Sequence, residues 1–164
     1  MRARSRSFEA FYAAHYDVVR RSLSAAFGDP LLAEDAVQEA FARAYVHWHR
    51  VDRMDRPAGW VYVVAVRFGL QQRRPRRTPE PDDPSVDIAD GVVTQEVVRA
   101  AIERLPTRQR VAVVLRYLVD LPLEDVAAAM DCALGTVKST LHSALVRLHV
   151  DLDEASEEVS HDAS

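Results

Sequence analysis

A set of small polar and basic side chains falls on one side of a helix predicted to begin near Leu134. The set comprises Thr136, Lys138, Ser139, Thr140, His142, Ser143 and Arg147. Hydroxyl, imidazole, ammonium and guanidinium groups are the donors and acceptors that contact phosphate oxygens and base edges in duplex DNA. The chemistry that these residues offer is therefore recognition through hydrogen bonds.

The segment around this face has the pattern of a helix-turn-helix. Val126, Ala127 and Met130 mark the buried side of a first helix, and only a short turn separates it from a second. The buried stripe of the second helix is predicted from the spacing of Val137, Leu141, Leu145 and Leu148. Two short helices joined in this way cross at a steep angle and place the start of the second in the major groove. An ordinary hairpin inside a helical bundle is the alternative, because the exposed face is only weakly basic.

A second polar surface is predicted on the helix between residues 30 and 48. Asp35, Gln38 and Glu39 are spaced so that they cluster opposite the apolar stripe, with Glu34 and Arg43 on the same side. A merely solvated helix face is the alternative. A binding role is favoured because this helix leads directly into a loop rich in tryptophan, histidine and arginine.

Aromatic and basic side chains are interleaved through that loop and the helix after it. They are Trp48, Arg50, Arg53, Trp60, Tyr62, Arg67 and Arg74. Proteins bind single-stranded DNA by stacking aromatic rings on the bases and by placing guanidinium groups against the phosphates. The pattern thus predicts a single-strand surface, with packing in the apolar core as the alternative for Trp48 and Trp60.

Composition limits the other classes of function. Apolar residues make up 48% of the 164 residues and there are only five glycines, which indicates a globular, all-helical chain. The single cysteine, Cys132, excludes an internal disulfide and suits a reducing compartment. No apolar run is long enough to span a membrane, and no apolar core follows the basic first residues. A cytoplasmic protein without membrane insertion is therefore predicted.

The sequence patterns typical of catalysis are missing. The sequence has no glycine-rich phosphate loop, no cysteine and histidine cluster at zinc spacing and no nucleophile paired with a base. His47 and His49 are two residues apart, which is poor spacing for a metal on a helix. A binding protein that is not an enzyme and needs no metal or cofactor is therefore predicted.

Prolines and charged blocks divide the chain. Helices are predicted over about 8–27, 30–48, 57–74, 93–104 and 107–119, before the helix-turn-helix. Residues 75–92 are rich in proline and acidic residues and cannot bury a core, which predicts a flexible linker. The net charge of −4 is unevenly distributed, with arginines around the start of the linker and six acidic residues after residue 150. We expect two small helical domains, 7–74 and 93–150, joined by the linker 75–92 and followed by an acidic tail, 151–164.

Three runs of this sequence together resemble a known family. They are AEDAVQEAFARAYVHW (33–48), RPAGWVYVVAVRFGL (56–70) and LPTRQRVAVVLRYL (105–118), the last of which continues into the helix-turn-helix. In this order they are similar to the extracytoplasmic-function (ECF) sigma factors of bacterial RNA polymerase, group IV of the sigma-70 family. The resemblance covers residues 8–148. It implies an all-α fold with a region 2 and a region 4 domain, and a role in promoter-specific transcription initiation.

The resemblance also implies a partner for each surface. Asp35, Gln38, Glu39 and Arg43 would dock on the clamp helices of the polymerase β′ subunit, and region 4 on the β flap. Residues 48–55 would capture a flipped base of the −10 element, and the helix 57–74, Gln71 included, would hold the melted strand. The helix from Leu134 would contact the −35 element. An anti-sigma factor is expected as a further partner, since the family makes such control common.

The recognition segment departs from the family's usual TVKSRLHRAL. Thr140 and Ser143 stand where basic residues are usual, and Ala133 stands where the turn usually supplies a serine cap. Loss of such a cap costs roughly 1 kcal/mol of helix stability, and the absence of basic side chains that would bind phosphates lowers the affinity for DNA. We therefore expect weak or unusual recognition of the −35 element. Two alternatives are a standalone helix-turn-helix regulator that does not use core polymerase, and a sigma-like interaction module that binds a partner but not promoters.

Overall fold

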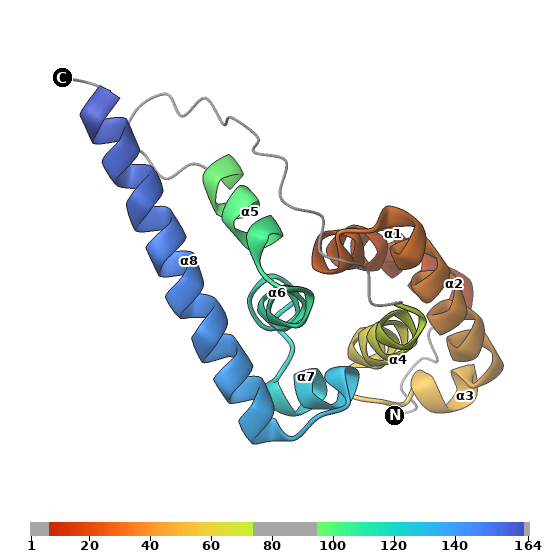
Figure 1. Cartoon of the computed structure of the whole chain (residues 1–164). Helices are drawn as coiled ribbons and strands as arrows, with labels where there is room; N and C mark the ends of the chain where they lie inside the picture. Colours follow the sequence, from red (N-terminus) through yellow and green to blue (C-terminus); the bar gives the residue numbers. More distant parts are fainter. Residues whose placement is uncertain (1–6, 74–94, 163–164) are drawn as a thin grey trace.

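The computed structural model describes residues 7–73 and 95–162, and helices make up its regular structure (Figure 1). The all-α prediction is confirmed. The elements in chain order are α1 (Phe8–Phe27), α2 (Pro30–Val46), α3 (Trp48–Val51), α4 (Pro57–Gln72), α5 (Gln95–Arg104), α6 (Thr107–Val113), the π-helical turn η1 (Val114–Leu118), α7 (Leu123–Met130) and α8 (Leu134–Asp162).

Local signals in the sequence set the bounds of the first two helices. The Oγ of Ser7 accepts a hydrogen bond from the backbone N–H of Ala10 at 3.1 Å and caps α1. Gly28 ends α1 with a φ of 64°, a left-handed conformation that glycine adopts without steric cost. The Oδ1 of Asp29 then accepts from the N–H groups of Leu31 and Leu32, each at 3.1 Å, and caps α2. Both predicted helix starts are confirmed.

The predicted bounds differ from the structure at three places. The second helix ends at Val46 and a separate turn, α3, follows it. The helix predicted over 107–119 becomes π-helical at η1, where the N–H of Val119 donates to the carbonyl of Val114 at 3.0 Å. The helix of the recognition segment does not stop before the acidic residues of 151–162 but continues through them as α8.

The length of α8 follows from a stripe of apolar residues within the acidic segment. Leu148, Leu152 and Ala155 recur at helical spacing and are half-buried, whereas the acidic Asp153 and Glu154 between them are exposed. α5 lies side by side with this part of α8 (Figure 1). Packing against α5 therefore extends the helix, and Asp153 and Glu154 lie on its outer face rather than in a separate tail.

The two predicted helical units are present, but they are packed against each other. α1, α2, α3 and α4 form one unit, and α5 to α8 form the other (Figure 1). α4 packs on α7, and α1 packs on α6 and η1. Buried residues of both units join in one apolar cluster, which includes Phe27, Val66, Leu115 and Val126. The expected linker, 75–92, lies outside the described residues.

Phe27 fixes how α1 meets α4. Its ring is fully buried and lies directly over Gly69 of α4, where any Cβ would overlap the ring. The absence of a side chain at Gly69 therefore allows the close approach of the two helices. This contact holds the end of α1 beside the end of α4, at the border with the second unit.

Candidate docking and nucleic-acid surfaces

The predicted acidic and amide patch lies on the outer face of α2. Asp35 and Gln38 are exposed, and Glu39 is half-buried beside them. The Nε of Arg43 donates to the Oε1 of Glu39 at 2.7 Å, one helical turn away. Ala36, Val37 and Ala40, on the opposite side of α2, are fully buried in the core. The structure thus brings the four predicted docking residues together on one accessible face.

An aromatic pocket that the sequence pattern does not predict adjoins this patch. The pocket is open and has a volume of about 260 Å³; it is lined by Phe8, Tyr12, Tyr16, Gln38, Phe41, Ala42 and Tyr45. Tyr12 and Tyr45 recur at the spacing of the apolar residues on α1 and α2, which favours a position facing the core, but they are 39% and 63% exposed. Helical spacing assigns aromatic residues to the side that faces a neighbouring helix. It does not reveal that α1 and α2 leave their shared edge open.

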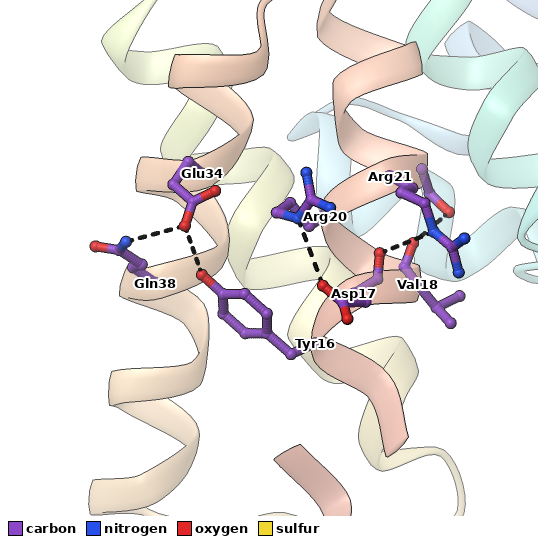
Figure 2. A network of polar contacts seen from close by, with 8 residues as sticks. Tyr16, Asp17, Val18, Arg20, Arg21, Glu34 and Gln38 are labelled. Atoms are coloured by element: carbon purple, nitrogen blue, oxygen red, sulfur yellow. Dashed lines mark hydrogen bonds and ion pairs between the residues drawn. The ribbon is translucent and has the colours of Figure 1, made fainter. Parts of the chain in front are cut away.

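A hydrogen-bonded network orders the carboxylate at the edge of this pocket. The hydroxyl of Tyr16 donates to the Oε1 of Glu34 at 2.9 Å, and the Nε2 of Gln38 donates to the same oxygen at 3.2 Å (Figure 2). The network joins α1 to α2, and an ion pair of 3.6 Å between Arg20 and Asp17 lies next to it on α1 (Figure 2). Desolvation, followed by the bond to Glu34, raises the pKa of Tyr16 to about 12.

The raised pKa of Tyr16 predicts that this residue's contribution to the free energy of unfolding depends on pH. Because the folded state favours the neutral phenol, the stabilisation by Tyr16 is fully present below the ordinary tyrosine pKa of about 10 and is lost as pH rises towards about 12. Tyr16→Phe is expected to lower the free energy of unfolding by about 1 kcal/mol at pH 8. The difference in the free energy of unfolding between the wild type and Tyr16→Phe, measured by urea unfolding, should shrink above pH 10.

The exposed Tyr117 of η1 supplies a matched control for this comparison. Tyr117→Phe removes a hydroxyl without removing a bond to Glu34, and it should leave the urea midpoint unchanged at pH 8. A gap between the wild type and Tyr16→Phe that stayed constant up to pH 12 would contradict the assignment of the shift to Tyr16.

The predicted single-strand residues around α3 divide into exposed arginines and packed aromatic rings. Arg50 and Arg53 are exposed. Trp48 is half-buried, with its ring 5.5 Å from Phe8 in an edge-on arrangement and 4.9 Å from Phe11. Trp60 is also half-buried and packs against the core. Only part of each indole ring therefore faces solvent.

Tyr62 does not lie on the predicted DNA surface. Its side chain is 5% exposed, and its hydroxyl donates to the Oγ of Ser22 in α1 at 3.2 Å. Burial raises the pKa of Tyr62, as expected for a phenol removed from water. The ring packs between α1 and α4, so it is a core residue in this structure. A sequence in which aromatic and basic residues alternate does not show which of them face the core and which face solvent, and for this reason the prediction for Tyr62 was wrong.

Arg67 and Gln71 are exposed on α4, and they lie at the border between the two units. The Nη2 of Arg67 donates to the Oδ1 of Asp131, at the end of α7, at 2.9 Å. An open pocket of about 230 Å³ separates the units here, lined by Arg67, Leu70, Gln71, Arg108, Ala129, Met130 and Asp131. Arg74, the last residue predicted for this surface, lies outside the described residues.

The helix-turn-helix is present as α7 and the first turns of α8. Asp131 ends α7 in the left-handed conformation, with a φ of 51°, which aspartate tolerates better than most residues. Ala133 then begins α8: its carbonyl accepts from the N–H groups of Thr136 and Val137 at 3.0 and 3.2 Å, but its side chain has no oxygen that could cap them. The structure thus places Ala133 directly before the first turn of α8, at the position where a serine would cap the helix.

Most of the predicted recognition residues are accessible on α8. Thr140 is half-buried, and the exposed residues are Thr136, Lys138, Ser139, His142, Ser143 and Arg147. The buried stripe differs from the prediction at one position. It consists of Val137, Leu141 and Ala144, with Leu148 half-buried, whereas Leu145 is 43% exposed. The small Ala144 is fully buried in place of Leu145 on the side of α8 that packs against the rest of its unit.

Two kinds of site are not found in the part of the chain that the structure describes. Over residues 7–73 and 95–162, His, Cys, Asp and Glu side chains form no group of three or more that could hold a metal ion. His47 and His49 are both exposed. No helix within the same residues has the length and apolar character needed to cross a membrane.

Comparison with known families covers both units. The family model for Sigma-70 region 2 matches residues 11–78, and the model for Sigma-70, region 4 matches residues 95–148. The first match includes the α2 face and α4, and the second includes the helix-turn-helix. Each candidate surface therefore lies within a segment that a sigma-70 family model describes.

Individual relatives agree with these matches. The chain is 30% identical over 151 residues to the RNA polymerase sigma-E factor of Streptomyces coelicolor, covering 88% of this chain and 85% of that one. It is 30% identical over 158 residues to the ECF RNA polymerase sigma factor SigL of Mycobacterium tuberculosis, covering 88% of each. The sigma factor RpoE of Bartonella quintana, solved with the anti-sigma factor NepR, has the same fold, with a TM-score of 0.65 at 23% identity over 89% of this chain and 96% of that one. This chain is a member of the sigma-70 family and belongs to its extracytoplasmic-function group of RNA polymerase sigma factors.

Proposed function

We propose that this chain binds core RNA polymerase in the cytoplasm and directs it to promoters, with no bond-making chemistry of its own. The observation that carries the proposal is the pairing of two accessible surfaces on separate units. One is the acidic and aromatic face of α1 and α2, and the other is the polar start of α8. A promoter-specificity subunit needs both, because one must contact polymerase while the other contacts DNA.

The face of α2 suits a partner helix with basic and apolar residues. Asp35, Gln38 and Glu39 offer carboxylate and amide groups, and the neighbouring pocket offers the rings of Tyr12 and Tyr45. Buried aromatic contacts supply affinity at protein interfaces, whereas complementary charge supplies orientation and specificity. We assign this face to the clamp helices of the β′ subunit and assign the β flap to the second unit.

Two contacts with DNA are assigned to other elements, one to α8 and one to α3 and α4. The polar face of α8 would enter the major groove at the −35 element through its first turns. Arg50, Arg53 and the half-exposed ring of Trp48 would bind the melted −10 strand, with Trp60, Arg67 and Gln71 along α4. Unstacking a base costs a few kcal/mol, and capture of the flipped base offsets this cost so that the open duplex is favoured.

An inhibitory partner is also proposed. Two solved structures that this chain resembles in fold are RpoE bound to the anti-sigma factor NepR and CnrH bound to the cytosolic domain of CnrY. The open aromatic pocket beside Gln38 is an exposed apolar surface, which is typical of a site that a partner covers. An anti-sigma factor seated there would compete directly with polymerase.

Capture of core polymerase by the tagged chain tests this proposal. We expect the β and β′ subunits to be retained by the wild-type protein and released by excess untagged protein. Retention of genomic DNA fragments by the tagged chain in the absence of core enzyme, with no retention of β and β′, would contradict the proposal and would favour a standalone helix-turn-helix regulator.

A further inference from the structure

The helix that carries the recognition residues is longer than the segment that the family model describes. The match to the region 4 model ends at residue 148, whereas α8 continues to Asp162 as one unbroken helix. The segment 149–162 is therefore an addition to the recognition helix, and we call it the α8 extension. Its described side chains include the acidic Asp151, Asp153, Glu154 and Glu157.

The charges of the α8 extension disfavour a helix at this place. The last carbonyls of a helix carry partial negative charge, so carboxylates near its C-terminus are destabilising. Asp153 and Glu157 are one turn apart and repel each other as like charges. The imidazole of His149 lies 3.5 Å from the carboxylate of Asp153, but exposed pairs of this kind contribute little. Contacts with another element must therefore keep the extension helical.

An apolar contact with α5 supplies this support. Val97 and Ala101 of α5 are only 8% and 4% exposed, although the main apolar cluster of the described residues includes neither of them. α8 is the principal neighbour of α5 among the described elements, and the two helices lie side by side (Figure 1). Leu152 and Ala155 of the extension are half-buried on the side of α8 that faces α5. The two helices thus share a small apolar contact of their own.

The beginning of α8 has little local support by comparison. Ala133 has no side-chain oxygen that could accept from the N–H groups of the first turn. Gly135 lies within that turn, where glycine is an unfavourable residue, and nothing lies within 4 Å of the position of a Cβ there. Thr136, the first of the predicted recognition residues, follows directly. The turns that would meet DNA therefore depend on contacts farther along the helix.

The contact with α5 is well placed to fix these turns. At about 1.5 Å per residue, Leu152 lies about 24 Å along α8 from Thr136. A tilt of about 5° around the first turn would move Leu152 by about 2 Å, which closely packed side chains resist. Helix formation is also cooperative, so support at one end favours helical structure at the other.

We infer that the α8 extension positions the recognition face: Leu152 and Ala155 pack on α5 and thereby fix the direction and the helical order of the first turns of α8, in place of the cap that Ala133 does not supply. This inference rests on the proposed function, in which those turns enter the major groove. Hydrogen bonds to base edges require a defined angle of entry, whereas phosphate contacts carry no sequence information. Leu152, Ala155 and Val97 are thus positioning residues that do not themselves contact DNA.

Leu152→Gln tests the inference without a change of charge. Glutamine is a good helix former, but its amide removes the apolar contact with α5. Two fluorescein-labelled duplexes serve as probes, one carrying a −35 element from a start site mapped by run-off transcription and one with that element scrambled. We expect the first duplex to bind roughly tenfold more weakly than to the wild type, equivalent to about 1.4 kcal/mol, and the second to bind less than about twofold more weakly.

Val150→Gln is the matched control. Val150 is 48% exposed and lies two residues from Leu152, on nearly the opposite side of the helix. Its replacement should leave the affinity for both duplexes unchanged. Val97→Gln disrupts the same contact from the α5 side and should reproduce the effect of Leu152→Gln, so it keeps the test decisive if Leu152→Gln fails to fold. Circular dichroism selects a temperature at which every variant compared is folded.

Ala133→Ser distinguishes positioning from a merely structural role. In the Leu152→Gln background, the serine cap should restore about fivefold of the affinity for the −35 duplex, equivalent to about 1 kcal/mol. In the wild type it should change that affinity less than about twofold, because the first turns are already ordered and the two effects are coupled. Hydrogen exchange of the backbone amides of residues 136–143 should be faster in Leu152→Gln and should slow again when Ala133→Ser is added.

Equal losses of affinity for the two duplexes, equal gains from Ala133→Ser in the two backgrounds, or unchanged hydrogen exchange in Leu152→Gln would each overturn the inference. Tighter DNA binding by Leu152→Gln would also overturn it, since the extension would then oppose binding. Absence of any start site that depends on the chain would contradict the proposed function, whereas hydrogen exchange in the expected order would still uphold the ordering of α8 by its extension.

Discussion

Charge reversal on α2 is expected to abolish binding of core polymerase. Asp35→Arg together with Glu39→Arg replaces two carboxylates on an accessible helix face and places Arg43 beside a like charge. Mismatched charges at an interface cost several kcal/mol, which corresponds to a loss of affinity of more than about 100-fold. The loss can be measured by fluorescence anisotropy of the labelled chain titrated with core enzyme.

The acidic outer face of α8 provides a control of the same spacing and charge. Asp153 and Glu157 are exposed and lie one turn apart. Their double replacement by arginine should leave core affinity unchanged. Both double variants should keep the helicity of the wild type. Native core affinity in the α2 variant would contradict the assignment of this face to docking.

Added positive charge on the recognition helix is expected to strengthen binding to duplex DNA. Thr140 and Ser143 lie on the accessible side of α8 with Thr136, at the positions where the family usually has basic residues. Thr140→Arg with Ser143→Arg should raise the affinity by about tenfold. The dependence on salt should also steepen, by about one unit of slope for each additional phosphate that an arginine neutralises. Titrations at several salt concentrations measure both quantities. Sequence preference need not improve, because phosphate contacts position the protein without specifying bases.

A control variant with two arginines farther along the same helix distinguishes the effect of their position from the effect of added charge alone. Val146→Arg with His149→Arg adds similar charge at exposed sites on α8, about 9 Å further from the turn. This pair should change the affinity and the salt slope less. Equal effects of the two pairs, or no effect of the first, would show that the first turns of α8 do not enter the groove as proposed.

Local structure in this chain was largely predictable from the sequence. The caps at Ser7 and Asp29 and the stop at Gly28 depend on neighbouring residues only, and they lie at the ends of the helices predicted over 8–27 and from residue 30. The helix-turn-helix was also predictable, since a short turn between two apolar stripes leaves few alternatives. Leu145 was misplaced because a small residue, Ala144, can form the buried stripe as well as a large one.

The border between the two units was not predictable in the same way. It depends on Gly59 of α4, where the absence of a side chain leaves room for Leu121 and Asp125 of the second unit. It also depends on backbone carbonyls, which every residue type has and whose hydrogen bonds the sequence therefore does not predict. Arg110 stands between the polar run 107–109 and the apolar run that begins at Val111, and nothing in its neighbours indicates that its side chain donates to the carbonyls of Ala26 and Phe27 at the end of α1. The aromatic pocket was missed for a related reason: Tyr12 and Tyr45 follow the apolar spacing, although both are exposed. Contacts between units depend on the fit of two surfaces, which periodicity within one helix does not describe.

Run-off transcription with purified core polymerase tests the central claim most directly. Core enzyme, this chain and genomic fragments should together yield transcripts with defined start sites, and the sequences upstream should share −10 and −35 elements. The α2 charge-reversal variant should give none of these transcripts, whereas the Asp153 and Glu157 control should give all of them. Absence of any start site that depends on the chain, with core polymerase bound, would contradict the account and would identify the chain as an interaction module that binds a partner but not promoters.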